Sequence, residues 1–248
     1  MKRFFAYFDL LGYKEFILKN DFDTQLMQIK NLLRDSELSL SDWKTKRIKN
    51  GNTVADIDNW KINCVNISDT IIFWTNNNDI ESFINLLKVS HSFCTINIIN
   101  NFLMRGTIIY DEFYIINPSQ ISNKDIVFIA NPMFGKGLVK AYIKTNCQKW
   151  AGCVIDDSVI EEINKITNAH EILNEFAIKY KVPYKENCNS PNEYVFRLYG
   201  PLNEETFMNV KEGIERNFSS FKKSTDKKDV KEKMKNTIEF LRFLIEVN

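Results

Sequence analysis

Two aspartates stand where a divalent cation site could form. Asp9 interrupts the apolar run FFAYFDLLGY at residues 4–13, and Asp69 lies in the stretch NISDTIIFW at residues 66–74. Hard cations such as Mg²⁺ take oxygen ligands and usually need only one or two protein carboxylates when substrate phosphates supply the other ligands. If the fold brings Asp9 and Asp69 together, the sequence predicts a site for a cation and a phosphorylated substrate.

The residues around these aspartates predict elements that would bring them together. The aromatic run at 3–9 is typical of a central strand, and Gly12 marks a turn into a helix whose free N–H groups would face phosphates. Residues 62–74 predict two strands joined tightly at Ser68 and Asp69. A helix over 79–100 and a strand from Arg105 complete the order β-α-β-β-α-β, which predicts an α+β, ferredoxin-like sandwich. In that sheet the first strand neighbours the hairpin, so Asp9 should lie beside Asp69.

The second half of the chain carries further elements and a helical end. We expect a catalytic domain over 1–200 and a C-terminal helical hairpin over 201–248, whose lysines at 222–235 are interpreted as a solvated helix surface. The other predicted elements are a loop at 117–119, strands at 126–130, 153–155 and 194–199, a glycine-opened helix at 133–146, and helices at 203–221 and 227–246.

Composition narrows the class of protein. With 248 residues, 44% of them hydrophobic, the chain can bury a sizeable core, and a net charge of +1 gives no general surface for nucleic acid. The five cysteines form no CxxC pair, which predicts free thiols in a reducing cytoplasm. No apolar stretch approaches the roughly 20 residues of a membrane span. We therefore expect a cytoplasmic protein with neither a membrane nor a nucleic-acid partner.

Each candidate residue also has a simpler structural interpretation. A single aspartate at a strand end commonly caps a turn, so the metal hypothesis depends on the pair. Arg105 could brace a triphosphate or pair with a carboxylate in the sheet, and Lys136 and Lys140 could meet phosphate or simply face solvent. With only two histidines, a histidine metal site is not expected. No P-loop or GxSxG motif is present.

Four stretches, in order, carry a family resemblance. FAYFDLLGYKEF, SDTIIFW, MRGTIIYDEFY and FGKGLVKAY, within residues 3–156, resemble the class III nucleotidyl cyclase catalytic domain, most closely the divergent bacterial pyrimidine cyclases of Pycsar-type anti-phage systems. The resemblance implies attack of a ribose 3′-hydroxyl on the α-phosphate of the same nucleotide, with loss of pyrophosphate. It also implies two Mg²⁺ or Mn²⁺ ions held by Asp9, Asp69 and the Leu10 carbonyl.

The resemblance also implies roles for other site residues, but at four positions this chain lacks the residue that the family carries. It places Arg105 and Lys140 in catalysis, and it places Leu10, Leu11, Gly12, Tyr13, Val65 and Lys136 at the substrate. The positions that read a purine base in the family fall on Val65 and Pro132, which argues against a purine substrate. The family's transition-state Asn and Arg correspond to Val139 and Ile143 in this chain. Another cation would therefore have to stabilise the transition state, and the candidates are Lys136, Lys140, Lys144 and Arg105.

The implied activity is a cytoplasmic homodimer that makes cUMP or cCMP from UTP or CTP. Its active sites would lie between two copies, and the cyclic product would activate a separate effector in antiviral signalling. The alternative is a catalytically silent cyclase-like module that binds a nucleotide or a protein, favoured by Val139 and Ile143. A polymerase-like palm is less favoured, because no strongly basic template groove is apparent.

Overall fold

The protein is described by a computed structural model. It covers residues 1–49, 51–58, 60–100, 102–116, 119–123, 126–130, 132–166, 168–188, 192–198 and 203–247, and for 99–100, 119–123, 126–130 and 169 it describes the backbone. No helix within these ranges has the length and apolar character needed to cross a membrane.

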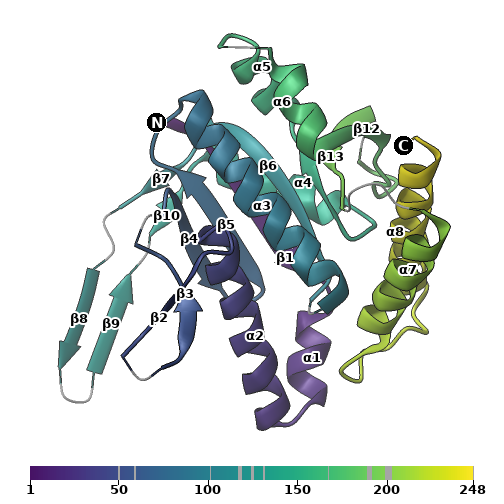
Figure 1. Cartoon of the computed structure of the whole chain (residues 1–248), viewed down its shortest axis with the longest axis horizontal. Helices are drawn as coiled ribbons and strands as arrows, with labels where there is room; N and C mark the ends of the chain where they lie inside the picture. Colours follow the sequence, from purple (N-terminus) through teal and green to yellow (C-terminus); the bar gives the residue numbers. More distant parts are fainter. Residues whose placement is uncertain are drawn as a thin grey trace.

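A seven-stranded sheet forms the centre of the molecule (Figure 1). Its strands lie in the order β12 (Ala177–Lys181), β13 (Asn192–Phe196), β11 (Gly152–Ile155), β6 (Met104–Glu112), β1 (Lys2–Leu10), β5 (Thr70–Thr75) and β4 (Ile62–Ile67). Strand β1 lies between β5 and β6 and is antiparallel to both, and β4 pairs antiparallel with β5. Together with the helices between them, these four strands give the β-α-β-β-α-β order. The predicted α+β, ferredoxin-like sandwich with a helical C-terminal part is confirmed. Its elements are β1 (Lys2–Leu10), α1 (Tyr13–Lys19), α2 (Phe22–Leu40), β4 (Ile62–Ile67), β5 (Thr70–Thr75), α3 (Ile80–Asn100) and β6 (Met104–Glu112).

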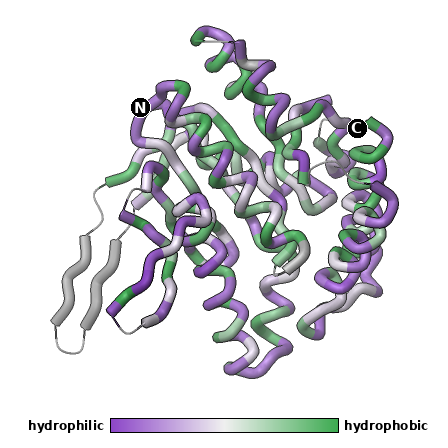
Figure 2. The backbone as a smooth tube through the Cα atoms, viewed as in Figure 1, coloured by the Kyte–Doolittle hydropathy of each residue, from purple (hydrophilic) through white to green (hydrophobic). Residues whose placement is uncertain are grey.

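Strand β1 is buried on both faces, which explains its nearly continuous apolar sequence. Phe4 and Phe8 belong to the large core that includes residues of α2 and α3, whereas Phe5 and Tyr7 pack with Ala141 of α4 (Lys136–Cys147) on the other face. Figure 2 shows hydrophobic colour concentrated on the central strands and α3, and hydrophilic colour along much of α2 and α8 (Lys228–Glu246). The sheet therefore holds the end of β1 firmly from two sides.

The C-terminal helices α7 (Glu204–Ser219) and α8 (Lys228–Glu246) join the main core. Phe207, Ile214 and Phe240 belong to the same hydrophobic cluster as β1, and the ring of Phe240 lies 4.8 Å from that of Trp150. The boundary expected at residue 200 falls on 199–202, outside the described residues, so the division into two domains stays a prediction.

Several elements differ from the sequence predictions. Ser119, expected in a loop, lies in a strand that pairs with the predicted strand at 126–130, while Asn117 and Pro118 lie outside the described residues. The helix expected from residue 133 begins at Lys136, because Met133 and Phe134 pair with another short strand and Gly135, at φ 140°, separates the two. The remaining elements are β2 (Thr45–Arg47), β3 (Thr53–Ala55), β7 (Tyr114–Ile115), β8 (Ser119–Asn123), β9 (Ile126–Ala130), β10 (Met133–Phe134), β11 (Gly152–Ile155), α5 (Asp157–Ile163), α6 (Ala169–Phe176), β12 (Ala177–Lys181) and β13 (Asn192–Phe196).

A glycine on β6 makes room for the aromatic core. Gly106 lies directly opposite Phe8 in the β1–β6 ladder, and a Cβ at this position would stand 2.3 Å from Phe8 Cδ1. We predict that Gly106→Ala lowers the free energy of unfolding by about 1–3 kcal/mol, the usual cost of overpacking a core. Urea denaturation measures this cost. Adding Phe8→Leu to Gly106→Ala should recover part of this lost free energy of unfolding. If the costs of the two single substitutions simply add in the double variant, the explanation is contradicted.

Candidate active site

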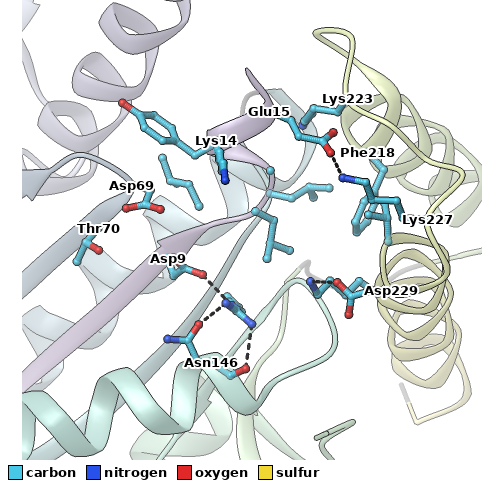
Figure 3. Close-up of a pocket in the computed structure, with 18 of the residues that line it drawn as sticks. Asp9, Lys14, Glu15, Asp69, Thr70, Asn146, Phe218, Lys223, Lys227 and Asp229 are labelled. Atoms are coloured by element: carbon cyan, nitrogen blue, oxygen red, sulfur yellow. Dashed lines mark hydrogen bonds and ion pairs between the residues drawn. The ribbon is translucent and has the colours of Figure 1, made fainter. Parts of the chain in front are cut away.

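The structure brings Asp9 and Asp69 to the same place, as the topology predicts. Asp9 is the penultimate residue of β1 and lies opposite Thr70 of β5, and Leu10 N–H donates to the Asp69 carbonyl at 2.9 Å. Asp69 occupies the tight turn between β4 and β5, where Ser68 has a φ of 58°. Both aspartates line a cavity of about 610 Å³ (Figure 3). Whether they bind metal stays a prediction.

The segment after β1 forms one wall of this cavity. Leu10, Leu11, Gly12 and Tyr13, all expected at the substrate, line it. Gly12 has a φ of 79°, a left-handed conformation that glycine adopts readily, and it turns the chain into α1. Leu11 N–H is already bonded to the Leu103 carbonyl at 2.8 Å, so this N–H is not free for a phosphate.

Arg105 pairs with Asp9, which is one of the two roles that the sequence left open. Its Nε donates to Asp9 Oδ2 at 2.8 Å, and the two side chains are only 11% and 19% exposed. The guanidinium also donates to the Asn146 carbonyl at 3.1 Å, to the Gln148 carbonyl at 3.3 Å and to Asn146 Oδ1. Arg105 is thus fixed at the cavity wall by the end of α4 and by β1.

The electrostatics of the carboxylate pair favour a cation. Burial raises the pKa of Asp9, Arg105 opposes this, and the charge of Asp69 raises the pKa further. Because the two carboxylates repel each other, a divalent cation held between them would relieve that repulsion. Within the described ranges no group of three or more His, Cys, Asp or Glu residues forms a metal site. The pair therefore fits a hard cation that takes its other ligands from phosphate, water or a backbone carbonyl.

Sequence reasoning missed the opposite wall of the cavity. It is formed by the end of α7, the connection to α8 and the first turns of α8, including Phe218, Lys223 and Lys233. The sequence pattern predicts a solvated helix surface for these lysines, because nothing in the local pattern indicates that the connection reaches back to β1. Lys227 forms an ion pair with Glu15 of α1, and Lys233 pairs with Asp229 at 2.6 Å (Figure 3).

Three other predicted site residues lie outside this cavity in a single chain. Lys136 and Lys140 line a second cavity of about 510 Å³, where Lys140 Nζ is 3.1 Å from Asp156 Oδ1. Val65 packs against the smaller hydrophobic cluster of the sheet. Lys144, the remaining candidate for a transition-state cation, is bonded to Asp156 at 2.6 Å and to Glu193. Burial lowers its pKa, but the charges of these two acids outweigh burial and raise it.

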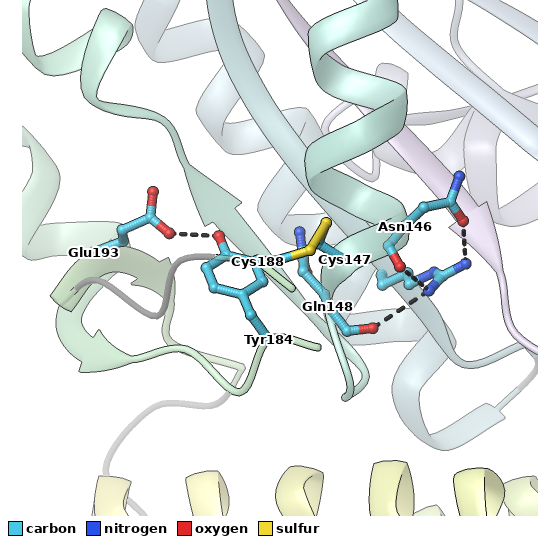
Figure 4. The surroundings of a disulfide bond; sticks show 7 residues. Asn146, Cys147, Gln148, Tyr184, Cys188 and Glu193 are labelled. Carbon is cyan, nitrogen blue, oxygen red and sulfur yellow. Dashed lines mark hydrogen bonds between the residues drawn. A yellow bond between two sulfur atoms is a disulfide. The ribbon is translucent and has the colours of Figure 1, made fainter. Parts of the chain in front are cut away.

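A disulfide between Cys147 and Cys188 overturns the expectation of free thiols (Figure 4). The bond joins the end of α4 to the loop before β13, and Lys185 N–H donates to the Cys147 carbonyl at 2.8 Å beside it. Asn146 and Gln148, which hold Arg105, flank Cys147 in the chain. The disulfide therefore braces the segment that fixes the arginine. The three other cysteines, Cys64, Cys94 and Cys153, are free.

The Asp9–Arg105 pair leads to a stability prediction. Arg105→Met leaves a mostly buried carboxylate without its cation, and we expect a loss of about 3 kcal/mol near neutral pH. The change raises the folded-state pKa of Asp9 further, so the folded chain binds its proton more tightly and stability falls as pH rises. The deficit should shrink towards about pH 4, in the range where carboxylates take up protons.

Urea denaturation at both pH values checks this prediction. Adding Asp9→Asn to Arg105→Met should recover part of the loss at neutral pH, because the unpaired charge is then gone. A deficit that does not change with pH would show that Arg105 acts through packing alone.

Comparison with known proteins shows similarity to solved structures at the level of the fold. No known protein-family model matches the chain, and no curated protein matches it. Among solved structures, it is similar to the catalytic core of a rhodopsin-guanylyl cyclase with converted specificity in complex with ATPαS, at 9% identity and a TM-score of 0.49, over 79% of this chain and 94% of that one. It is also similar to the adenylyl cyclase CyaB from P. aeruginosa, at 8% identity and a TM-score of 0.47, over 80% and 97% of the two chains. A bacterial light-regulated adenylyl cyclase shows 8% identity and a TM-score of 0.43, over 87% and 56%.

Proposed function

We propose that the protein is a nucleotide cyclase that converts a pyrimidine nucleoside triphosphate, UTP or CTP, into its 3′,5′-cyclic monophosphate and pyrophosphate. The observation that carries the proposal is the meeting of Asp9 and Asp69 in one cavity of about 610 Å³ that also has lysines in its wall. A carboxylate pair next to cationic side chains suits a cation-bound polyphosphate. The motif resemblance supplies the reaction type.

In the proposed reaction the ribose 3′-hydroxyl gives its proton to water, its oxygen bonds to the α-phosphorus, and pyrophosphate leaves with the electron pair of the broken P–O bond. Asp9, Asp69 and the Leu10 carbonyl would hold Mg²⁺ or Mn²⁺, and such ions would supply charge neutralisation for the displacement. Arg105 orients Asp9 through the ion pair at 2.8 Å and opposes the rise of its pKa that burial causes. The sheet supplies the rigidity that an in-line geometry requires.

A pyrimidine substrate is supported by two side chains that cannot read a purine. Val65 is apolar and packs on the sheet, and Pro132 has neither a side-chain donor nor a backbone N–H. The hydrogen-bonding groups that select a purine in the resembling family are thus missing at both positions. The choice between UTP and CTP follows from neither residue.

A homodimer is supported by the outer surface of α4. Val139, Tyr142 and Ile143 are each more than half exposed, an unusual set of apolar side chains for one helix face. Lys136 and Lys140 lie on the same helix and do not reach the aspartates of their own chain. We propose that a second copy covers this surface and brings its α4 lysines to the Asp9 and Asp69 cavity.

The antiviral part of the proposal rests on the sequence resemblance, which assigns the cyclic product to a separate effector. We also place the enzyme in the cytoplasm, as the cysteine pattern and the lack of a long apolar stretch suggest. Disulfides in that compartment are usually transient or redox-sensing. The Cys147–Cys188 bond would then form and break with the redox state of the cell.

The activity is tested by incubating the purified protein with each of the four nucleoside triphosphates and Mg²⁺ or Mn²⁺. Mass spectrometry should detect cUMP or cCMP. Asp69→Ala should abolish the product while the thermal unfolding temperature stays close to that of the wild type, because Asp69 lies in a surface turn. Asp58→Ala, which removes an exposed carboxylate far from the cavity, is the matched control.

Each other result has a definite meaning. Absence of any cyclic product, with nucleotide binding retained, would favour the silent binding module. A cyclic purine as the sole product would keep the reaction and overturn the argument from Val65 and Pro132. Full activity of Asp69→Ala would remove Asp69 from the metal site.

The shared site is tested by mixing inactive variants. Asp69→Ala and the double variant Lys136→Ala/Lys140→Ala should each be inactive, and an equal mixture should recover about a quarter of wild-type activity. In a two-fold dimer, random exchange makes half of the molecules mixed, and each mixed dimer holds one intact site. A mixture as inactive as its components would contradict a site built from two copies.

A further inference from the structure

The connection between α7 and α8 closes the cavity from the side opposite the aspartates. Figure 3 shows Lys223, Lys227 and Asp229 across the cavity from Asp9 and Asp69. The same cavity is lined by Phe218, Ser224, Val230 and Lys233 of this segment. The C-terminal helices therefore do more than cover the core, because they supply side chains to the candidate active site.

Lys223 is held in this wall by a packing contact and by a hydrogen bond. Its aliphatic stem lies against Gly12, where an added Cβ would stand 2.8 Å from Lys223 Cδ. Its Nζ donates to the Asn217 carbonyl at 2.6 Å, and the Asn217 side chain in turn donates to the Ile98 carbonyl at 3.0 Å. The ammonium group is thus tied to α7 and, through it, to α3.

Lys223 also differs from its neighbours in charge compensation. Lys227 has Glu15 as an ion-pair partner, and Lys233 has Asp229. No carboxylate forms an ion pair with Lys223 in the part of the chain that the structure describes. Burial lowers the pKa of Lys223 to about 8, opposed by the more distant charge of Glu15. A mostly buried cation without a counter-ion is costly, and an anion bound in the cavity would offset that cost.

We propose that Lys223 binds the phosphate chain of the substrate, so that the triphosphate lies between the Asp9 and Asp69 end of the cavity and the C-terminal connection. The inference rests on the proposed function for the identity of the substrate. Lys223 would supply the site with a cation from the same copy of the chain. Such a cation is needed because Val139 and Ile143 occupy the positions at which the resembling family carries its transition-state residues.

A polyphosphate fits this cavity better than a single small anion. Its volume of about 610 Å³ falls in the range of small-molecule sites. One end offers two carboxylates for a cation, and the other end offers an ammonium group that forms no ion pair with any residue the structure describes. A ligand that carries both a bound cation and further negative charge satisfies both ends at once.

The direct test uses inorganic tripolyphosphate with Mg²⁺ and isothermal titration calorimetry on the full chain. Lys223→Met keeps an unbranched apolar stem against Gly12 and removes the charge. It should weaken binding by about tenfold or more, the loss typical of one charge-assisted hydrogen bond. Lys222→Met, which removes a charge from the exposed neighbouring lysine, should bind as the wild type does, and Lys223→Arg should retain part of the affinity.

A measurement on the wild type does not depend on the variant folding. Tripolyphosphate should slow acylation of Lys223 by an amine-reactive ester and leave Lys222 unaffected, as peptide mass spectrometry would show. Equal affinity of Lys223→Met and wild type, no protection of Lys223, or no binding of tripolyphosphate to the wild type would each overturn the proposal.

The two proposals fail separately. If no triphosphate is cyclised but tripolyphosphate binding still depends on Lys223, the proposed cyclase function falls and the phosphate site stands. If a cyclic nucleotide forms at the same rate and with the same KM in Lys223→Met, the cyclase function stands and the role of Lys223 falls.

Discussion

The ion pair between Asp9 and Arg105 is the interaction on which the candidate site depends. Asp9 is mostly buried at the end of β1, where burial raises its pKa, and the guanidinium at 2.8 Å opposes that effect. Arg105 stays in place because the backbone carbonyls of Asn146 and Gln148 accept hydrogen bonds from it. Three segments distant in sequence thus meet at one carboxylate. A metal site that includes Asp9 would depend on all three.

A second polar region, which includes Lys144 of α4, has a structural role. Lys144 lies between Asp156 and Glu193, and Tyr184 donates to Glu193 as well. Glu193 is 1% exposed, so its charge needs these partners. The network fastens β13 to α4 close to the disulfide. The second cavity is therefore bordered by an internally satisfied charge network, whereas two carboxylates, Asp9 and Asp69, line the first cavity, and the charge of Asp69 raises the pKa of Asp9.

The sequence predicted the central sheet well because its signals are local. The aromatic run of β1, the turn at Ser68 and Asp69 and the helix after Asp79 each follow from short-range patterns, and the strand order then places Asp9 beside Asp69. The disulfide and the wall at Lys223 could not be predicted this way. Cys147 and Cys188 are 41 positions apart without a pairing motif. Lys223 reaches Gly12 through tertiary packing alone, which no window of sequence reports.

The closing of the cavity by both halves of the chain also bears on how the protein folds. Asp9 and Gly12 are synthesised early, whereas Lys223 and Lys233 emerge from the ribosome after nearly all of the sheet. Domains begin to fold during synthesis, and contacts of such wide sequence separation form late and slowly. The sheet can assemble around β1 while the cavity is still open on one side. A nascent chain that lacks residues 218–233 would hold both aspartates and still have no closed pocket, so the binding site is completed only after the scaffold that carries it.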